Sequence, residues 1–238
     1  DSGNGHTMSL FPTYAWTTDR FGNGNSAIDF QSSGYGDVTG ITTGGAMTVA
    51  GWVRWNSLGS YSRFFDFGNG WGYGALDTIW VGNVATTNTL RYCIEDADSP
   101  TYSHCVDAPN AITTGQWMHV AATVDLAGAM KLYINGTQVG STSGVAPLVG
   151  VRTHNYFGKS TWSADAPFNG RMDDILIAHQ ALSATDIATI AGASGILRHE
   201  YRSSTDGGSS WGSATTGASA TVTAEGETLL QFRSVAND

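Results

Sequence analysis

Hydrophobic and polar residues alternate with a period of two in eight short segments of the chain. In such a segment every second side chain points to the same side, so one face is apolar and the other is polar. This pattern is typical of β-strands that bury one face, and so many strands favour a two-sheet antiparallel sandwich. The segments cover residues 26–32, 46–55, 61–68, 77–83, 90–96, 117–125, 130–136 and 171–179.

Turn residues separate these segments, and one stretch has a different period. Asn135-Gly136 lies between two alternating runs and can adopt the positive φ angles of a tight hairpin turn. In residues 181–192, Ser183 can cap a helix whose third position is Asp186, and Gly192 can end it. The sequence therefore predicts an all-β sandwich with one short helix.

The two cysteines are predicted to form a disulfide. Cys93 and Cys105 flank a polar, turn-rich stretch between two strand-like runs, which places them on paired strands of a hairpin. A disulfide implies an oxidising compartment, so we expect a secreted or cell-surface protein, whereas two free thiols are the alternative. No signal peptide and no apolar run of about 20 residues is present, and we expect no membrane insertion.

The charge balance excludes one class of partner. The formal net charge is -9, and lysine occurs only at Lys131 and Lys159, so no basic surface is available to neutralise a phosphate backbone. We therefore expect no nucleic-acid partner. The acidic excess suits a hard cation such as Ca²⁺, although solubility through net charge is the favoured explanation of the excess as a whole.

The sequence contains few residues arranged for catalysis. Glutamate occurs only at positions 95, 200, 225 and 227, and no strand carries the paired acids that glycoside hydrolysis needs. The six histidines are dispersed and lack zinc-binding spacing, and His119 lies within an apolar strand where a structural role is expected. We expect that the protein is not an enzyme.

Six blocks of the sequence carry a resemblance through their order and spacing. They are DSGNG, TTDRFGNGNSAIDF, AMTVAGWVRW, GQWMHVAATVD, KLYINGTQVG and FNGRMDDILIAHQALSATDIATI. Together they resemble a known family, the laminin G-like and concanavalin A-like lectin/glucanase jelly rolls of bacterial extracellular proteins. The resemblance covers residues 1–191 and implies a jelly-roll domain over residues 1–194, built from two curved antiparallel sheets. It also implies a calcium-stabilised edge and a role in binding glycans or proteins.

The remaining residues, 195–238, resemble part of a bacterial immunoglobulin-like repeat and are too few to bury a core of their own. Members of the jelly-roll family usually carry a further strand just before the segment that begins at Asp1. We expect the segment LRHEYRSS, residues 197–204, or the hairpin that follows it to supply that edge strand, in the same chain or in a neighbouring subunit. A truncated linker piece is the alternative.

A calcium site is implied at one edge of the sandwich. Ca²⁺ needs six to eight oxygen ligands, which carboxylates and glycine-rich loops supply. In the resembling fold the ion ties an early loop to the last strand, which predicts Asp173 as a ligand, with Asn25 or Gly24 giving a backbone carbonyl. Asp1 and Asn4 are further candidates. The alternative is that the carboxylate of Asp173 bonds only backbone amides.

Surface aromatic residues are the candidates for ligand binding, because sugar rings stack on them while polar neighbours bind the hydroxyl groups. The loop with Trp71 and Tyr73 is the richest candidate, and Arg63 or Asp66 could join it. Other aromatic residues in or beside loops are Trp55, Tyr61, Trp80 and Trp162.

These observations together predict a non-catalytic extracellular binding or adhesion module that recognises a glycan or a cell-surface protein. The alternative is a structural subunit of a surface assembly that exchanges edge strands. Because one fold serves many functions, the sequence leaves the ligand open.

Overall fold

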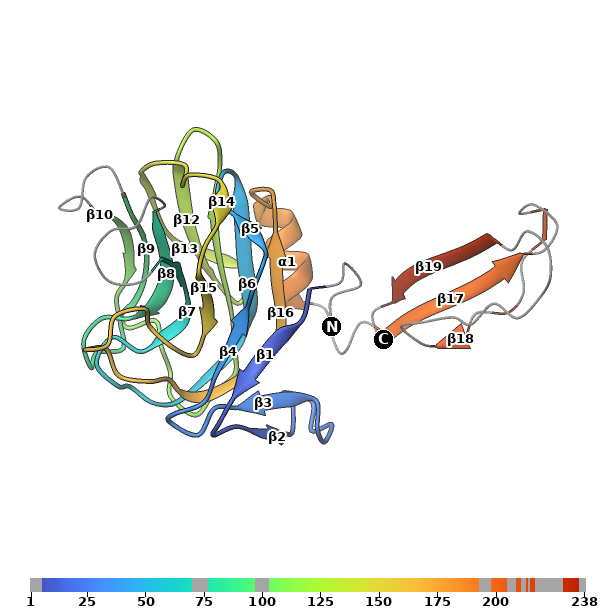
Figure 1. Cartoon of the computed structure of the whole chain (residues 1–238), viewed down its shortest axis with the longest axis horizontal. Helices are drawn as coiled ribbons and strands as arrows, with labels where there is room; N and C mark the ends of the chain where they lie inside the picture. Colours follow the sequence, from blue (N-terminus) through green and yellow to red (C-terminus); the bar gives the residue numbers. More distant parts are fainter. Residues whose placement is uncertain are drawn as a thin grey trace. The chain divides into compact units, whose positions relative to one another are not determined.

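The computed structural model describes residues 6–69, 77–96, 103–192, 198–204, 209–210, 213, 215–216 and 229–235 of the 238-residue chain. The chain divides into two compact units, Asp1–Gly192 and Ala193–Asp238. Two seven-stranded sheets and a helix belong to the first unit, and a three-stranded sheet belongs to the second (Figure 1).

The first sheet of the large unit is antiparallel throughout, and its strands come from distant parts of the sequence. Its order is β1 (Met8–Phe11), β4 (Tyr35–Val38), β15 (His154–Phe157), β7 (Arg63–Gly68), β8 (Thr78–Asn83), β9 (Leu90–Glu95) and β10 (Ser103–Ala108).

The second sheet packs against the first and is also antiparallel. Its order is β13 (Thr137–Ser143), β12 (Ala129–Ile134), β11 (Met118–Val124), β6 (Met47–Ser57), β16 (Asn169–Ala178), β3 (Ala27–Asp29) and β2 (Ala15–Thr17). A two-stranded sheet pairs β5 (Thr42–Thr43) with β14 (Gly150–Val151). Each of the eight predicted segments contains a strand, and the predicted two-sheet antiparallel sandwich is confirmed.

The core lies between the inner faces of the two sheets. In β7, Phe65 and Phe67 are fully buried in this core, whereas Asp66 between them points to the opposite side of the sheet. A register shift near the start of β7 turns Phe64 into the core as well. Its ring fits because β6 carries Gly51 at that point, where a Cβ atom would lie 3.1 Å from the ring. Full burial of one phenylalanine contributes roughly 1.5–3 kcal/mol.

The predicted helix, α1 (Ala184–Gly192), begins with the expected cap. The Oγ atom of Ser183 accepts a hydrogen bond from the backbone N–H of Asp186 at 3.2 Å, and the Asp186 carboxylate accepts from the Ser183 N–H at 3.1 Å. This reciprocal pair satisfies two backbone donors at the start of the helix. Ile187 is buried in a small cluster with Ala50, Ala121 and Tyr133, so the helix covers part of the outer face of the second sheet.

The predicted disulfide between Cys93 and Cys105 is present. The two residues lie directly opposite each other in β9 and β10, with their Cα atoms 4.2 Å apart. Sequence reasoning succeeded here because the two strand-like runs and the turn-rich stretch between them define the hairpin.

In the second unit, β17 (Arg198–Ser204) pairs with β18 (Thr215–Thr216) and with β19 (Leu229–Val235). The expectation that this segment supplies an edge strand to the large sandwich stays a prediction. Within the described residues, no helix is both long enough and apolar enough to cross a membrane.

His119 of β11 is buried, as expected for a structural histidine, with only 1% of its surface exposed. Burial and the nearby Arg20 lower the pKa of His119 to about 4. An unfolded histidine titrates near 6.5, so the unfolded chain binds this proton more tightly between these two pH values. The contribution of His119 to stability is therefore present above about pH 6.5 and is lost as the pH falls toward 4.

Replacing His119 with phenylalanine is expected to stabilise the protein by about 2 kcal/mol at pH 5, because the variant has no proton to bind on unfolding. At pH 8 the difference from the wild type should be smaller. Urea denaturation at both pH values measures the effect, with the exposed His179→Gln as a control. An equal change in stability at pH 5 and pH 8 would contradict the assignment.

Candidate functional site

The outer face of the first sheet carries a row of aromatic, polar and sulfur-containing side chains. Side chains directly opposite on neighbouring strands point to the same side of a sheet. Phe67 and Ile79 belong to the core, so the residues that alternate with them along β7 and β8 point outward. From β4 to β10 the row runs Asp37, Tyr156, Asp66, Trp80, Cys93 and Cys105.

An arginine organises the centre of this face. The Arg63 guanidinium donates from Nε to Asp66 at 3.3 Å and from Nη2 to Asp165 at 2.7 Å. Its Cζ atom lies 3.7 Å from the centroid of the Trp80 ring. Arg63 and Asp66 are only 4% and 1% exposed, so this is a buried ion pair covered by an aromatic ring. We call Arg63, Asp66, Trp80, Glu95 and Asp165 the arginine cluster.

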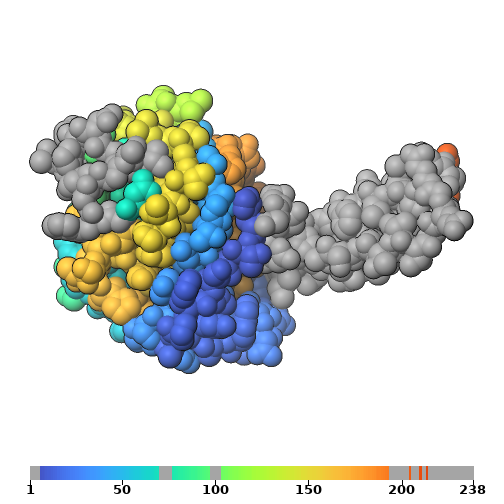
Figure 2. Space-filling model, viewed as in Figure 1, coloured from blue at the N-terminus to red at the C-terminus, as the bar shows by residue number. Residues whose placement is uncertain are grey.

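The loop that follows β15 is bonded to the same two carboxylates. Ser160 donates from Oγ to Asp66 at 3.2 Å and to Asp165 at 2.7 Å in alternative hydrogen bonds, and Thr161 donates to Asp66 at 3.0 Å. The backbone N–H of Trp162 donates to Ser160 Oγ at 3.0 Å. These bonds fix the loop over one end of the arginine cluster. Residues around 145–165, yellow to light orange, form much of the visible surface of the first unit in Figure 2.

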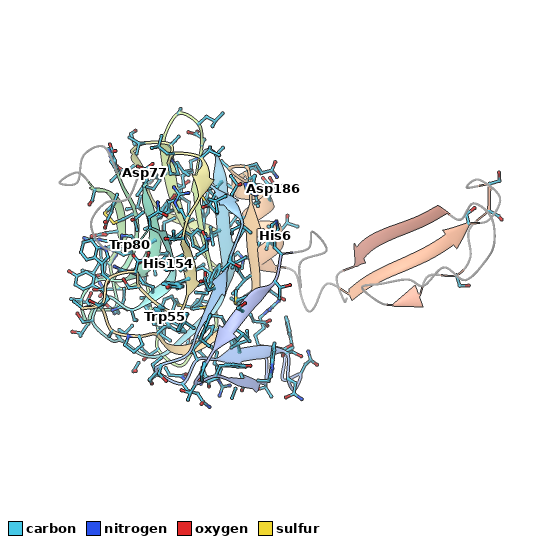
Figure 3. All side chains as sticks on the ribbon, in the orientation of Figure 1. His6, Trp55, Asp77, Trp80, His154 and Asp186 are labelled. Carbon is cyan, nitrogen blue, oxygen red and sulfur yellow. A yellow bond between two sulfur atoms is a disulfide. The ribbon has the colours of Figure 1, made fainter. Side chains whose placement is uncertain are left out.

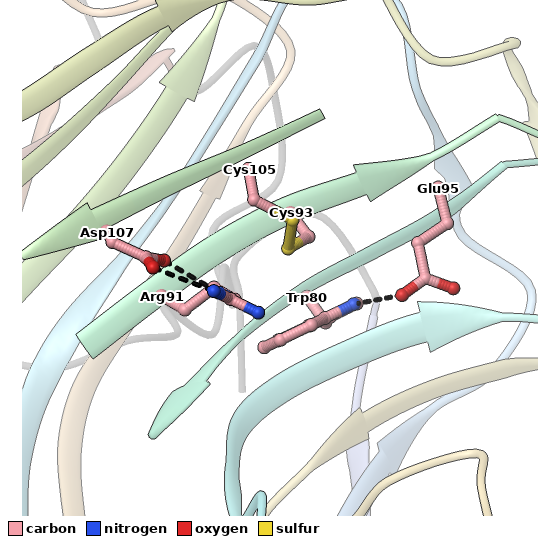
Figure 4. Close-up of a disulfide and its surroundings, with 6 residues drawn as sticks. All are labelled: Trp80, Arg91, Cys93, Glu95, Cys105 and Asp107. Carbon is pink, nitrogen blue, oxygen red and sulfur yellow. Dashed lines mark hydrogen bonds and ion pairs between the residues drawn. A yellow bond between two sulfur atoms is a disulfide. The ribbon is translucent and has the colours of Figure 1, made fainter. Parts of the chain in front are cut away.

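Glu95 is the acid of the arginine cluster that bonds to Trp80 and not to Arg63. Its Oε1 atom accepts a hydrogen bond of 2.8 Å from the indole N–H of Trp80, beside the disulfide (Figure 4). Burial and the nearby carboxylates of Asp66 and Asp165 raise the pKa of Glu95, and the Trp80 hydrogen bond opposes them. The residue is nevertheless partly exposed. A group that approaches this face can therefore reach one carboxyl group of the cluster.

A second group of aromatic residues lies on the β1 side of the row. Phe11 and Tyr35 are stacked with ring centroids 4.6 Å apart, and His154 is stacked on Tyr156 at 4.7 Å. Tyr35 meets Tyr156 edge to face at 5.3 Å. The ammonium group of Lys159 lies 4.1 Å from the Tyr35 ring centroid and 4.8 Å from that of Tyr156. We call these five residues the tyrosine cluster; Figure 3 labels His154 from it and Trp80 from the arginine cluster.

Tyr61 stands at the rim of the arginine cluster in an unusual backbone conformation. Its φ angle is 53°, in the left-handed region that bulky side chains rarely occupy. Its partly exposed ring lies 5.9 Å from the Arg63 guanidinium carbon, and its backbone N–H donates to the carbonyl of Ala85 at 2.9 Å. Strain of this kind persists where surrounding contacts over-determine a conformation, and it concentrates at functional sites.

Only some of the predicted ligand-binding residues lie on this face of the sheet. Arg63 and Asp66 lie on the outer face of the first sheet, but they are buried beneath their neighbours, and Tyr61 lies at the rim. The assignment of Trp55 to ligand binding is wrong, because its side chain is 0% exposed and packs edge to face against Phe168 in the core. Trp71 and Tyr73 lie outside the described residues.

Sequence reasoning did not identify the tyrosine cluster. Its members come from three separate regions of the sequence, around Phe11, around Tyr35 and within residues 154–159, so no single local motif marks them all. The available signal was that Tyr156 occupies the same alternation as His154, which indicates a shared face. Trp80 was recognised only as an aromatic residue beside a loop, although its strand alternation already directed it away from the core.

Asp173, the predicted calcium ligand, instead contacts an arginine. Arg20, in the loop after β2, donates from Nη1 to Asp173 at 3.2 Å and to Asp174 at 2.7 Å. The guanidinium carbon lies 4.3 Å from the ring centroid of Phe21 and 4.4 Å from that of Trp52. The predicted link between an early loop and the last strand thus exists, and a guanidinium forms it.

The oxygens predicted to bind calcium are largely used by protein donors. Burial and Asp174 raise the pKa of Asp173 to about 6, against the effect of Arg20. The Gly24 carbonyl accepts a bond of 3.2 Å from Ser26, and Asn25 is exposed. Among the described residues, no three side chains of the metal-binding types are grouped to hold an ion. Asp1 and Asn4 lie outside the described part.

Calcium binding through Asp173 would therefore require Arg20 to move away, and these residues as arranged do not fit the ion. The calcium site stays a prediction. The melting temperature with and without EDTA tests it: a decrease on chelation supports the ion, and no change supports the Arg20 contact as the sole link.

Comparisons with known proteins agree with this fold. The sequence profile of the concanavalin A-like lectin/glucanase superfamily matches residues 23–188. A search of the curated proteins found none that matches the chain.

Solved structures share the fold at low sequence identity. Domain 4 of AbnA, an extracellular arabinanase from Geobacillus stearothermophilus determined with arabinotriose, has a TM-score of 0.61 and 21% identity and covers 77% of this chain and 87% of its own. The binding domain of botulinum neurotoxin serotype G has a TM-score of 0.60 and 15% identity over 84% of this chain and 53% of its own.

A further neurotoxin structure is similar to the same degree. The serotype D ligand-binding domain, determined with N-acetylneuraminic acid, has a TM-score of 0.57 and 16% identity over 84% of this chain. This chain spans about half of the length of these neurotoxin domains, 53% and 52% respectively. At such identities the likeness shows a shared fold.

Proposed function

The chain belongs to the concanavalin A-like lectin/glucanase superfamily, and from this premise we propose that it is a non-catalytic, extracellular carbohydrate-binding module. The ligand binds across the outer face of the first sheet. The observation that carries the proposal is the row of aromatic and polar side chains that six neighbouring strands bring together on that face.

The chemistry of this face suits a carbohydrate. Sugars offer hydroxyl groups that need donors and acceptors in fixed positions, together with apolar C–H surfaces that pack on aromatic rings. The buried arginine cluster holds its neighbours in place, and a ring of partly or fully exposed groups surrounds it. These groups are Phe11, Tyr35, Tyr61, Arg91, Glu95, Asp107, His154, Lys159, Thr161 and Trp162.

The arrangement of acids supports binding rather than hydrolysis. A glycosidase needs two carboxyl groups on either side of the scissile bond. In the arginine cluster, Asp66 and Asp165 bond to Arg63, Ser160 and, for Asp66, Thr161. Asp66 is 1% exposed and the Asp165 side chain is 9% exposed, so both carboxylates beside Glu95 are largely covered.

The neighbours and the disulfide support the cellular location. AbnA is described as an extracellular arabinanase, and its domain 4 was determined with arabinotriose. The disulfide of this chain suits an oxidising environment. We place the protein outside the cell or on its surface, with a glycan as the ligand, either free or carried by a cell-surface protein.

Replacing Tyr61 with glycine tests the proposed site. Glycine accepts a φ angle of 53° without the side-chain clash, which costs a non-glycine residue about 1–2 kcal/mol, so stability should be unchanged or slightly higher. Loss of the ring should weaken binding at least tenfold. Oligosaccharide arrays followed by calorimetric titration measure the affinity, and thermal melting measures the stability.

Trp16→Ala is the matched control, because it removes an exposed ring from β2 in the second sheet. It should leave carbohydrate affinity unchanged. The proposal fails if the wild-type protein binds no carbohydrate on the arrays, or if Tyr61→Gly binds as tightly as the wild type.

One observation favours a second candidate function, a structural subunit that accepts an edge strand from another copy. β16 pairs with β6 along most of its length but with β3 only at Arg171 and Met172. No described strand pairs with that edge of residues 174–178, and a cavity of about 690 Å³ lies beside it. Its apolar lining includes Met8, Leu10, Val38, Phe157, Ile175 and Ile177.

Strand exchange would produce a dimer or a larger assembly. Light scattering over a range of concentrations distinguishes the candidates: a monomer favours the binding module alone, and a stable oligomer favours strand exchange. Deleting residues 195–238 should abolish such an oligomer if this segment supplies the strand.

A further inference from the structure

Lys159 is an unusual cation in this protein. Lysine occurs only twice in a chain of net charge -9, and the other lysine, Lys131, is exposed on β12 of the second sheet. Lys159 lies on the proposed binding face, where its ammonium group approaches the rings of Tyr35 and Tyr156 to 4.1 and 4.8 Å. Among the described residues, no carboxylate lies within ion-pair distance of it.

The nearby acids have other partners. Asp37, opposite Tyr156 on β4, accepts a hydrogen bond of 3.1 Å from the backbone N–H of Asn155. Asp66, opposite Tyr156 on β7, is bonded within the arginine cluster. The Lys159 ammonium therefore interacts with aromatic faces and keeps its three N–H donors for an acceptor from outside.

The two tyrosine rings also limit the positions of this side chain. A cation over an aromatic ring gains roughly 0.5–1 kcal/mol at an exposed site, and more when water is excluded. The same contact reduces the entropy that Lys159 loses when a ligand binds, because the side chain is already ordered. His154, stacked on Tyr156, adds a second group that can donate a hydrogen bond beside it.

We propose that the ligand is an acidic carbohydrate and that its anionic group binds the ammonium of Lys159. This inference rests on the proposed function and specifies its substrate class. An acidic protein repels anionic polymers in general, so a local cation on the binding face provides selectivity for an acidic sugar positioned there. A carboxylate of a uronic or sialic acid and a sulfate ester share the chemistry that Lys159 would recognise.

The test compares acidic oligosaccharides with their neutral counterparts. The probes are trigalacturonate and its methyl ester, sialyllactose and lactose, and a sulfated galactan oligosaccharide before and after desulfation. Calorimetric titration of the full chain should show at least tenfold tighter binding to one acidic member than to its neutral partner. The pair of probes that shows this difference identifies whether Lys159 binds a carboxylate or a sulfate ester.

Two variants assign the effect to Lys159. Lys159→Gln should lose at least tenfold more affinity for the acidic probe than for its neutral partner, whereas Lys159→Arg should retain most of the preference. Lys131→Gln is the matched control and should change nothing. Thermal melting checks that each variant is folded, and the wild-type comparison of acidic with neutral probes needs no variant.

Each outcome separates the two proposals. Equal binding of acidic and neutral probes, or an acidic preference that survives in a folded Lys159→Gln, overturns the inference and leaves the carbohydrate-binding function intact. Absence of binding to every carbohydrate overturns the proposed function itself.

Discussion

Replacing Arg152 with methionine is expected to lower the free energy of unfolding by about 3–5 kcal/mol, because several buried acceptors lose their donor at about 1–3 kcal/mol each. Arg152 is 1% exposed and donates to three backbone carbonyls, those of Thr43, Leu148 and Asp77, at 2.7, 3.0 and 2.8 Å. It also donates to the Thr43 hydroxyl at 2.8 Å. Methionine fills much of the space but satisfies none of these acceptors, each of which is costly to leave unpaired.

The variant loses only the hydrogen bonds of one side chain, but the stability of the whole fold should fall. Arg152 joins the loops around β5 and β14 to the start of β8, and Asp77 strengthens this junction by accepting from the N–H of Leu148 at 2.6 Å. Arg171→Met is a control, because its ion pair with Asp29 at 3.0 Å is partly exposed and should contribute about 1 kcal/mol or less. Urea denaturation measures both variants. Equal losses for the two would show that Arg152 does not hold the loops together.

Replacing Asp66 with alanine is expected to cost a similar 3–5 kcal/mol, because Arg63 would keep a buried charge with one fewer partner. The hydroxyl of Thr161 would also lose its acceptor, which lies 3.0 Å away. The loop after β15 should loosen, so binding to the outer face of the first sheet should weaken together with stability.

Asp66→Asn separates charge from shape. Burial raises the pKa of Asp66 even though Arg63 opposes it, so the folded protein favours the neutral form of this carboxyl group more than water does. Asparagine keeps an acceptor for the arginine cluster and should cost clearly less than alanine in the same urea denaturation. If the two variants lose the same free energy, the hydrogen-bond network around Asp66 does not carry the stability assigned to it.

The sandwich could be predicted well from the sequence because the patterns that indicate it involve residues close together in the chain. Alternation within each strand, the Ser183 cap and the Cys93–Cys105 hairpin all depend on residues close together in the chain, and each was confirmed. Sheet order and register depend on pairing between distant segments, so the row from Asp37 to Cys105 could not be predicted from periodicity.

The candidate site was predicted only in part for the same reason. One segment of the sequence contains Tyr61, Arg63 and Asp66, which were identified as candidates. The partners of Arg63 outside this segment, Trp80 and Asp165, belong to β8 and to the loop after β15. Trp55 was assigned wrongly because it was placed beside a loop. The strand β6 continues to Ser57, so Trp55 is still part of the strand and its side chain is buried in the core. Arg20 was not considered as a partner of Asp173, since 153 residues separate them.

Hydrogen exchange with and without an oligosaccharide identified on the arrays tests the central claim most directly. If the outer face of the first sheet binds the sugar, amides in the flanking loops, residues 58–63 and 158–165, should exchange more slowly in the complex. The turns at 125–128 and 135–136, between strands of the second sheet, should not change. Protection confined to those turns, or to the cavity beside β16, would contradict the account.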